Sequence, residues 1–240
     1  MSELQTARVF DRRIFTIAAV LFPLIVLAGF ARTYYLSTFF DAPPIPTALV
    51  HLHGLLMTAW VSLFVTQVWL VSSKRVWLHR RLGMAGIGLA ALIVPAGLAT
   101  ALRAAKYGST STPPGIPPLA FLIVPLFDLV VFVPLFAAAI YYRRQPAVHK
   151  RLMLLTAINF LPPAIARIPI ASLQALGPVW FFGLPALLAI AWFILDTRRH
   201  GLNRIALTAM ILMIASYPLR LMLLGSESWL RIAGWLTSFV

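Results

Sequence analysis

Long stretches of apolar residues alternate along the chain with short polar segments that are rich in arginine and lysine. A hydrocarbon core about 30 Å thick is crossed by roughly 20 residues of α-helix. Seven stretches have about this length, so we predict an all-α protein, one transmembrane domain over residues 1–240. An amphipathic stretch behind Ser226, residues 226–240, predicts a further helix lying in the membrane interface. The predicted spans are residues 14–35, 48–72, 82–102, 119–141, 152–173, 179–195 and 202–224.

Local signals refine two of these spans. Pro46 and Thr47 fit the start of the second span, as a first-turn proline and a helix cap. Pro162 and Pro163 lie inside the fifth span, which is also the most polar of the seven. A proline inside a helix removes a backbone donor, so we expect the fifth span to be kinked there.

The basic residues give the orientation of the spans. Lysine and arginine collect in the cytoplasmic loops of membrane proteins. With a cytoplasmic N-terminus, 14 basic residues fall on the cytoplasmic side and five on the other, so the C-terminus is expected outside. The first group is Arg8, Arg12, Arg13, Lys74, Arg75, Arg80, Arg81, Arg143, Arg144, Lys150, Arg151, Arg198, Arg199 and Arg204; the second is Arg32, Arg103, Lys106, Arg220 and Arg231.

The composition supports a membrane protein and excludes several other classes of protein. The chain is 61% hydrophobic and 11% charged, with a mean hydropathy of +0.90. The formal charge of +14 comes from clusters between spans, which face lipid headgroups, so we expect the bilayer and no nucleic acid as partner. There is no cysteine, which excludes disulfides and thiolate-held iron–sulfur clusters. Retinal is also excluded, because no lysine lies inside the last span.

Three of the five histidines, His79, His149 and His200, are predicted at the cytoplasmic mouths of spans that run outward. Imidazole is the commonest metal ligand and an axial ligand of haem iron, so we interpret these three as candidate cofactor and metal ligands. Each lies beside arginines, so contact with lipid phosphate or simple interfacial solvation is the alternative interpretation.

The other two histidines are predicted near the outer end. His51 and His53 are two residues apart on a helix and therefore point to nearly opposite sides, so one of them should face the bundle alone. Either could act as a single outer ligand or exchange protons near a quinone. The alternative is a pair of interfacial histidines with ordinary hydrogen bonds.

Ionisable side chains inside the spans form a second group of candidates. A charged residue within a span costs at least about 2.5–3.5 kcal/mol, so a partner is expected. Asp128 and Arg167 are predicted at similar depth, and we predict that they pair. Arg220 is expected to extend to the outer headgroups or to share a polar cavity with this pair. We predict that five residues line this polar cavity: Asp128, Arg167, Arg220, Gln67 and Asn159.

Three other predictions concern packing. Asp196 ends the sixth span near Arg198 and Arg199, which favours an ion pair at the interface. Gln67 and Asn159 are expected to hydrogen-bond between helices. Methionines at positions 153, 210 and 213 are expected to fill the core, although methionine is also an axial ligand of haem.

The segments HLHGLLMTAWVSLFVTQVWLV, HRRLGMAGIGLA and HKRLMLLTAINFLPPAIAR resemble a family of uncharacterised bacterial integral membrane proteins of about this length. The resemblance covers roughly residues 50–167 and the region 196–200, and it implies the bacterial inner membrane without implying an activity. A more distant likeness, to haem b membrane proteins of the cytochrome b561 and ferric-reductase kind, rests on histidines near helix ends. It implies haem b at the inner histidines, because no second outer helix carries one.

Three functions follow from these observations. The leading one is a haem- or metal-binding, redox-active membrane protein, with haem b or a histidine-bound metal ion as cofactor and quinone as a candidate partner. The second is a small transporter or channel whose polar cavity lies around Asp128, Arg167 and His53. The third is a non-catalytic component that associates with other membrane subunits or with copies of itself.

Overall fold

Helices make up the chain in the computed structural model, which describes residues 3–40, 45, 47–109, 112–113 and 115–240 and contains no strand among them. The elements are α1 (Glu3–Phe30), η1 (Ala31–Tyr35), η2 (Ser37–Phe39), α2 (Ala48–Ser72), α3 (Val76–Tyr107), α4 (Pro118–Phe121), α5 (Ile123–Tyr141), η3 (Tyr142–Arg144), α6 (Pro146–Asn159), α7 (Pro162–Ala166), α8 (Ala171–Gln174), α9 (Pro178–His200), α10 (Arg204–Leu223) and α11 (Glu227–Thr237). The all-α prediction is confirmed.

Six helical segments of the described chain are long and apolar enough to cross a membrane. In the most apolar part of each, only 17–44% of the residues are buried inside the protein, so most of the apolar surface faces outward. Such a surface fits lipid rather than water. The six segments are Val9–Tyr35, Ala48–Ser72, Val76–Tyr107, Pro118–Arg144, Pro178–His200 and Arg204–Leu223.

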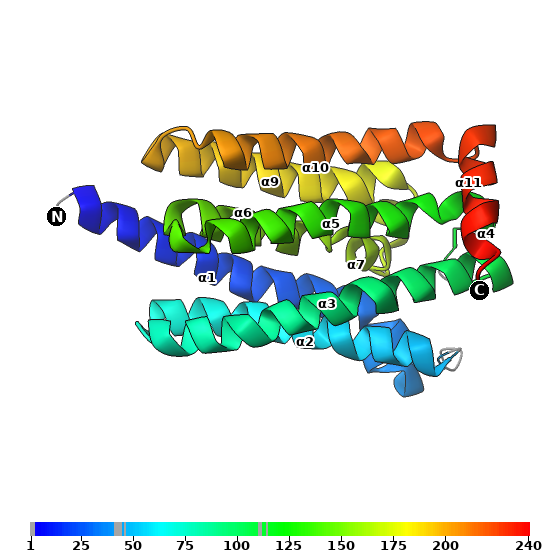
Figure 1. The fold of residues 1–240 in the computed structure, drawn as a ribbon, viewed down its shortest axis with the longest axis horizontal. Helices are drawn as coiled ribbons and strands as arrows, with labels where there is room; N and C mark the ends of the chain where they lie inside the picture. Colours follow the sequence, from blue (N-terminus) through cyan, green and yellow to red (C-terminus); the bar gives the residue numbers. More distant parts are fainter. Residues whose placement is uncertain (1–2, 41–44, 46, 110–111, 114) are drawn as a thin grey trace.

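The predicted fifth span, residues 152–173, is not one continuous helix. α6 ends at Asn159 and α7 begins at Pro162, so the kink predicted at the two prolines is a complete break in the helix. Nine of the 14 residues of α6 are buried, which explains how a stretch this polar can lie in the middle of an apolar bundle. The chain passes from the end of α5 to the start of α9 through α6 and α7, which lie among the longer helices (Figure 1).

The turns that carry the basic clusters lie at one end of the bundle. The α2–α3, α5–α6 and α9–α10 turns and the start of α1 all lie at this end (Figure 1), and we call it the basic end. α11 runs across the opposite end beside α4 rather than along the bundle (Figure 1). The indole Nε1 of Trp229 donates to the Ala120 carbonyl oxygen at 3.0 Å, which fixes α11 to α4.

Two predicted caps are present. The Thr47 side chain accepts a hydrogen bond from the backbone N–H of Val50 at 3.3 Å, and that of Ser226 accepts one from Trp229 at the same distance. Pro46, also predicted to mark the start of α2, lies outside the described residues. Of the predicted core methionines, Met210 and Met213 are buried and Met153 is partly buried against the same core.

Gly29 brings α1 and α7 into close contact, and this gives a test of the packing. A Cβ atom at Gly29 would lie 2.1 Å from the Ala164 carbonyl oxygen, which belongs to the backbone and cannot swing aside. We expect Gly29→Ala to lower the free energy of unfolding by about 1–3 kcal/mol, as overpacking does. Unfolding of the detergent-solubilised protein measures this.

Gly88→Ala is the matched control, because a Cβ atom at this helical glycine would meet nothing within 4 Å. It should leave stability unchanged or raise it slightly, since alanine favours helix more than glycine does. Equal effects of the two substitutions would contradict the close α1–α7 contact.

Candidate functional site

His79 and His149 face each other at the basic end of the bundle. His79 lies in the first turn of α3, and His149 lies in the first turn of α6, which begins at Pro146. Their ring centroids are 6.3 Å apart with an interplanar angle of 78°. The structure therefore brings together two of the three inner histidines that the sequence singled out.

The His149 ring is held in one orientation by α5. Its Nδ1 lies 2.8 Å from the carbonyl oxygen of Ala139, which can only accept a hydrogen bond. Nδ1 therefore carries the hydrogen and donates it, and Nε2 of the neutral ring keeps its lone pair. Metal-ligating histidines are commonly oriented by such a bond from the other ring nitrogen.

His79 and Gln67 contribute buried polar atoms that no other described residue satisfies. Both His79 Nδ1 and Gln67 Oε1 are shielded from solvent and have no hydrogen-bond partner in the described part of the chain. Gln67 belongs to α2, and its backbone borders the His79 ring of α3. The Gln67 side-chain nitrogen lies beside Gly83, which is one helical turn beyond His79 in α3. An unsatisfied buried polar group costs about 1–3 kcal/mol, so each of these two atoms gains from a bound partner, whether water or a ligand.

His200 does not join the other two inner histidines. Its Nε2 lies 3.0 Å from a carboxylate oxygen of Asp11 in α1, and its ring lies edge-on to Phe10. The sequence left open whether the three candidate ligands converge, and the structure places His200 apart from the His79–His149 pair. The reason is packing: the last turn of α9 lies against α1, which the sequence pattern alone does not specify.

Asp11, Asp196 and His200 form a group whose ligand atoms lie within 4.8 Å of one another. Both carboxylates already have a cationic partner: Lys150 lies 2.5 Å from Asp11, and Arg151 lies 2.6 Å from Asp196. A bound cation would have to compete with these side chains, so the group is a network of ion pairs that joins α1, α6 and α9.

The Arg151–Asp196 pair is buried, with side chains only 4% exposed. The sequence had suggested Arg198 and Arg199 as partners of Asp196 at the interface, and this is wrong. Arg151 and Asp11 were missed as site residues because both belong to basic clusters that looked fully solvated. A lone acid among the arginines of α1 is the signal that could have drawn attention to Asp11.

The outer histidines point to different sides, as predicted. His51 is exposed, and its Nδ1 lies 3.2 Å from the Tyr34 hydroxyl, which is placed there by the π-helical turn η1. His53 faces α3, where its ring lies 3.6 Å from the position of a Cβ on Gly97. No other histidine of the described chain contacts either one.

Asp128 and Arg220 form the second buried ion pair, nearer the α11 end. Arg220 Nη1 donates to Asp128 Oδ1 at 2.5 Å, and the Arg220 side chain is completely buried. Arg220 Nη2 also donates to Ser216 Oγ at 3.2 Å, and the guanidinium lies 5.3 Å from the ring centre of Phe182. Asn159 donates to the Asp128 backbone carbonyl at 2.9 Å, confirming its predicted role between helices.

The predicted partner of Asp128 was Arg167, and the structure corrects this to Arg220. Arg167 donates to the Pro163 carbonyl at 2.7 Å and lies over the Phe30 ring. After the break in the helix, α7 packs against α1 and α9, whereas α10 packs directly on α5. Arg220 was expected to reach the headgroups, and it instead turns inward.

Two cavities are described, and both are apolar. The larger, of about 550 Å³, lies between α5, α6 and α10, and the smaller, of about 190 Å³, lies between α1, α6 and α9. Neither is lined by Asp128, Arg167 or His53. Asp128 and Arg220 are packed instead among Phe127, Phe182 and Tyr217.

Comparisons with protein-family models, with curated proteins and with solved structures gave no significant match to this chain. The function is therefore argued from the site alone.

The buried ion pair gives a quantitative test. Asp128→Asn leaves the Arg220 charge buried without its counterion, so we expect the free energy of unfolding to fall by about 3–5 kcal/mol. Adding Arg220→Gln to that variant should cost much less than Arg220→Gln costs in the wild type. Detergent unfolding of the single and double variants measures the coupling.

Arg167→Gln is the control, because it removes another inward-lying arginine of the same half of the bundle. Its effect should add to that of Asp128→Asn to within about 0.5 kcal/mol. A stronger coupling of Asp128 to Arg167 than to Arg220 would overturn the assignment.

Proposed function

We propose that this chain is a multi-pass protein of the bacterial inner membrane whose His79–His149 pair binds a metal ion or haem iron in a redox role. The observation that carries the proposal is the placement of two imidazoles from different helices within 6.3 Å, one of them oriented by a backbone carbonyl. A histidine-bound iron or copper centre supplies one-electron transfer when it is bound.

The spacing of the two rings fits a shared metal. A histidine nitrogen lies about 2.0–2.1 Å from a bound metal, so two imidazoles on one metal have ring centroids roughly 5 Å apart at a tetrahedral angle and about 6.5 Å apart on opposite sides of the metal. The observed 6.3 Å is close to the second arrangement. His149 Nε2 is free to act as a ligand, and the unpartnered His79 Nδ1 supplies a second nitrogen.

A metal ion and haem make different demands on the space between the two rings. A porphyrin would have to lie between His79 and His149, and neither of the two cavities above extends there. A metal ion needs only the two nitrogens and one or two further donors. Gln67 Oε1, buried and without a partner among the described residues, is a further donor of the same region.

We also propose seven membrane passages, with the N-terminus in the cytoplasm and the C-terminus outside. The broken α6–α7 segment is then the fifth passage. Its position among the other helices supports this, because a helix break is tolerated at membrane depth only where protein surrounds it. The meeting of the basic turns at one end supports the orientation, since these turns are cytoplasmic under the positive-inside rule.

Metal analysis and absorbance spectroscopy of the detergent-purified protein test the site. We expect about one equivalent of a transition metal, and a Soret band if the metal is haem iron. His79→Ala and His149→Ala should each lose most of it, because each removes one of two ligands. His51→Ala is the matched control and should retain the wild-type content, since His51 is exposed at the other end.

The outcome that rejects the site is a wild-type protein that is colourless and free of metal after purification without chelators. Equal losses in the His51 and His149 variants would also reject it.

Reporter fusions test the fifth passage. A fluorescent protein that folds only in the cytoplasm, fused after Ser73 or after Gly201, should be bright in both cases, whereas a fusion after Val240 should be dark. If α6 and α7 do not cross, the α9–α10 turn lies outside and the Gly201 fusion is dark. That result would contradict the seven-passage arrangement.

A further inference from the structure

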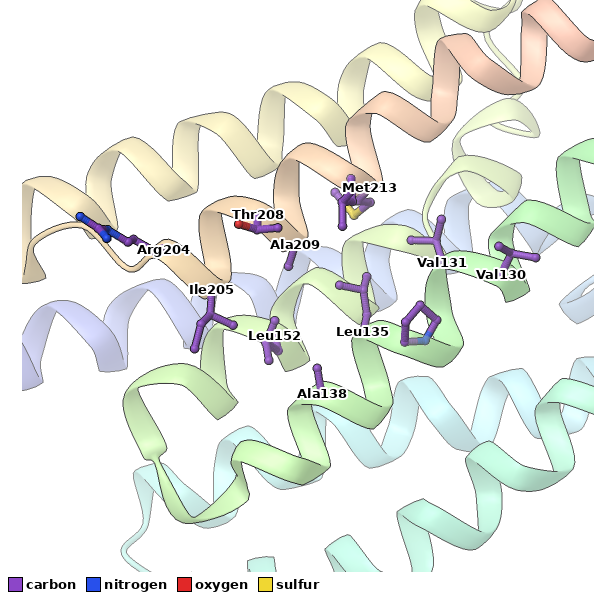
Figure 2. Close-up of a pocket in the computed structure, with 12 residues that line it drawn as sticks. Val130, Val131, Leu135, Ala138, Leu152, Arg204, Ile205, Thr208, Ala209 and Met213 are labelled. Carbon is purple, nitrogen blue, oxygen red and sulfur yellow. The ribbon is translucent and has the colours of Figure 1, made fainter.

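The larger cavity is a groove on the side of the bundle, between α5, α6 and α10. α5 forms one wall, α10 forms the facing wall, and Leu152 of α6 lies between them (Figure 2). Apart from one arginine and one threonine, its lining is entirely apolar. The facing side chains that the argument uses are Val130, Leu135 and Ala138 of α5, and Ile205, Ala209 and Met213 of α10.

Arg204 supplies a positive charge at the mouth of this groove. It is the first residue of α10, directly after the cap in which Asn203 accepts a hydrogen bond from the Ala206 N–H at 2.9 Å. The Arg204 side chain is exposed and pairs with no acidic residue of the described chain, unlike the buried Arg151 and Arg220. An anionic group outside the protein is the natural partner of such an arginine.

The length of the groove matches one leaflet of a bilayer. Arg204 and Met213 are nine residues apart on α10, which is about 13.5 Å at 1.5 Å per residue. Half of a hydrocarbon core of about 30 Å is about 15 Å. A molecule whose charged head lies at Arg204 would therefore reach the middle of the membrane when its chain lies along the groove.

The volume of the groove fits a single hydrocarbon chain. The groove has a volume of about 550 Å³ and is open along its side, so a hydrocarbon chain can enter from the membrane and lie along it. The exposed, unpaired Arg204 at the mouth favours an occupant with an anionic head over an apolar partner helix or a second copy of this basic chain.

We propose that this groove is a binding site for an anionic phospholipid from the leaflet at the basic end. One acyl chain lies between α5 and α10, and the phosphate binds Arg204. The aliphatic walls select a chain without polar groups, and the unpaired arginine selects a negative head over a zwitterionic one.

Native mass spectrometry of the purified full chain in a neutral detergent tests the proposal. The protein is titrated with phosphatidylglycerol and with phosphatidylcholine of the same acyl chains. We expect wild type to retain phosphatidylglycerol preferentially. Arg204→Gln should lower this affinity about fivefold, which corresponds to about 1 kcal/mol for one arginine at an anionic headgroup. It should lower phosphatidylcholine binding less, because the choline ammonium offsets the charge of the same phosphate.

Two further variants separate the groove from general attraction to a basic surface. Ala209→Leu and Ala138→Leu fill the groove from opposite helices, and either should weaken the binding of both lipids. Arg199→Gln removes the same charge at the same end outside the groove lining, and should leave the preference intact. Two substitutions on different helices keep the test valid if one of them prevents folding.

Two results would overturn the proposal. If Arg199→Gln and Arg204→Gln reduce phosphatidylglycerol binding equally, the charge acts only through the overall basic surface. If a folded groove-filling variant binds both lipids as wild type does, the acyl chain lies elsewhere.

Discussion

The α6–α7 segment is surrounded by protein, and the other helices are arranged around it. Hydrocarbon offers no hydrogen bonds, so backbone freed by a helix break has to lie away from lipid. The break between Asn159 and Pro162 meets this requirement, since every residue from 154 to 162 is buried. This constraint explains both the position of the segment and its polar composition.

Contacts of this one segment reach most of the bundle. Lys150 pairs with Asp11 of α1, Arg151 with Asp196 of α9, and Asn159 hydrogen-bonds to α5. The Ile165 carbonyl accepts from the Trp180 indole N–H of α9 at 3.0 Å. His149 reaches His79 of α3 for the same reason: a central helix has neighbours on every side.

The two buried ion pairs act at different levels of the bundle. Arg151–Asp196 holds α6 to α9 near the basic end, and Arg220–Asp128 holds α10 to α5 nearer the α11 end. Moving a charge from water into a protein interior is costly, so such pairs add little net stability. Their effect is specificity, because any arrangement that separates the partners leaves an unpaired charge in an apolar surrounding.

Sequence reasoning predicted positions along the helices well and helix neighbours poorly. Apolar run length gave the bounds of α2, and Thr47 and Ser226 were recognised as caps, because these features depend on local chemistry. Asp128 was correctly expected to have an arginine partner, but depth along a helix does not say which way a side chain points. Arg167 and Arg220 both satisfied the depth argument, and only packing decided between them.

In the fifth span, too, the local features were predicted better than the surroundings of the helix. Pro162 and Pro163 predicted a kink where the structure has a break, and run length alone counted residues 152–173 as one span. Its polar residues, Thr156 and Asn159 among them, are the feature that distinguishes a passage surrounded by protein. The separation of His200 from the other inner histidines had no comparable signal, because it depends on how α9 lies against α1.

Cross-linking of cysteine pairs tests most directly whether α6 lies where it brings His149 to His79. The chain has no cysteine of its own, so His79→Cys/His149→Cys can be joined by a short bifunctional maleimide without background. After cleavage at a protease site inserted between α3 and α4, the two fragments should remain linked, whereas those of His79→Cys/His200→Cys should separate. Separation of the first pair, or equal linking of both, would contradict the account.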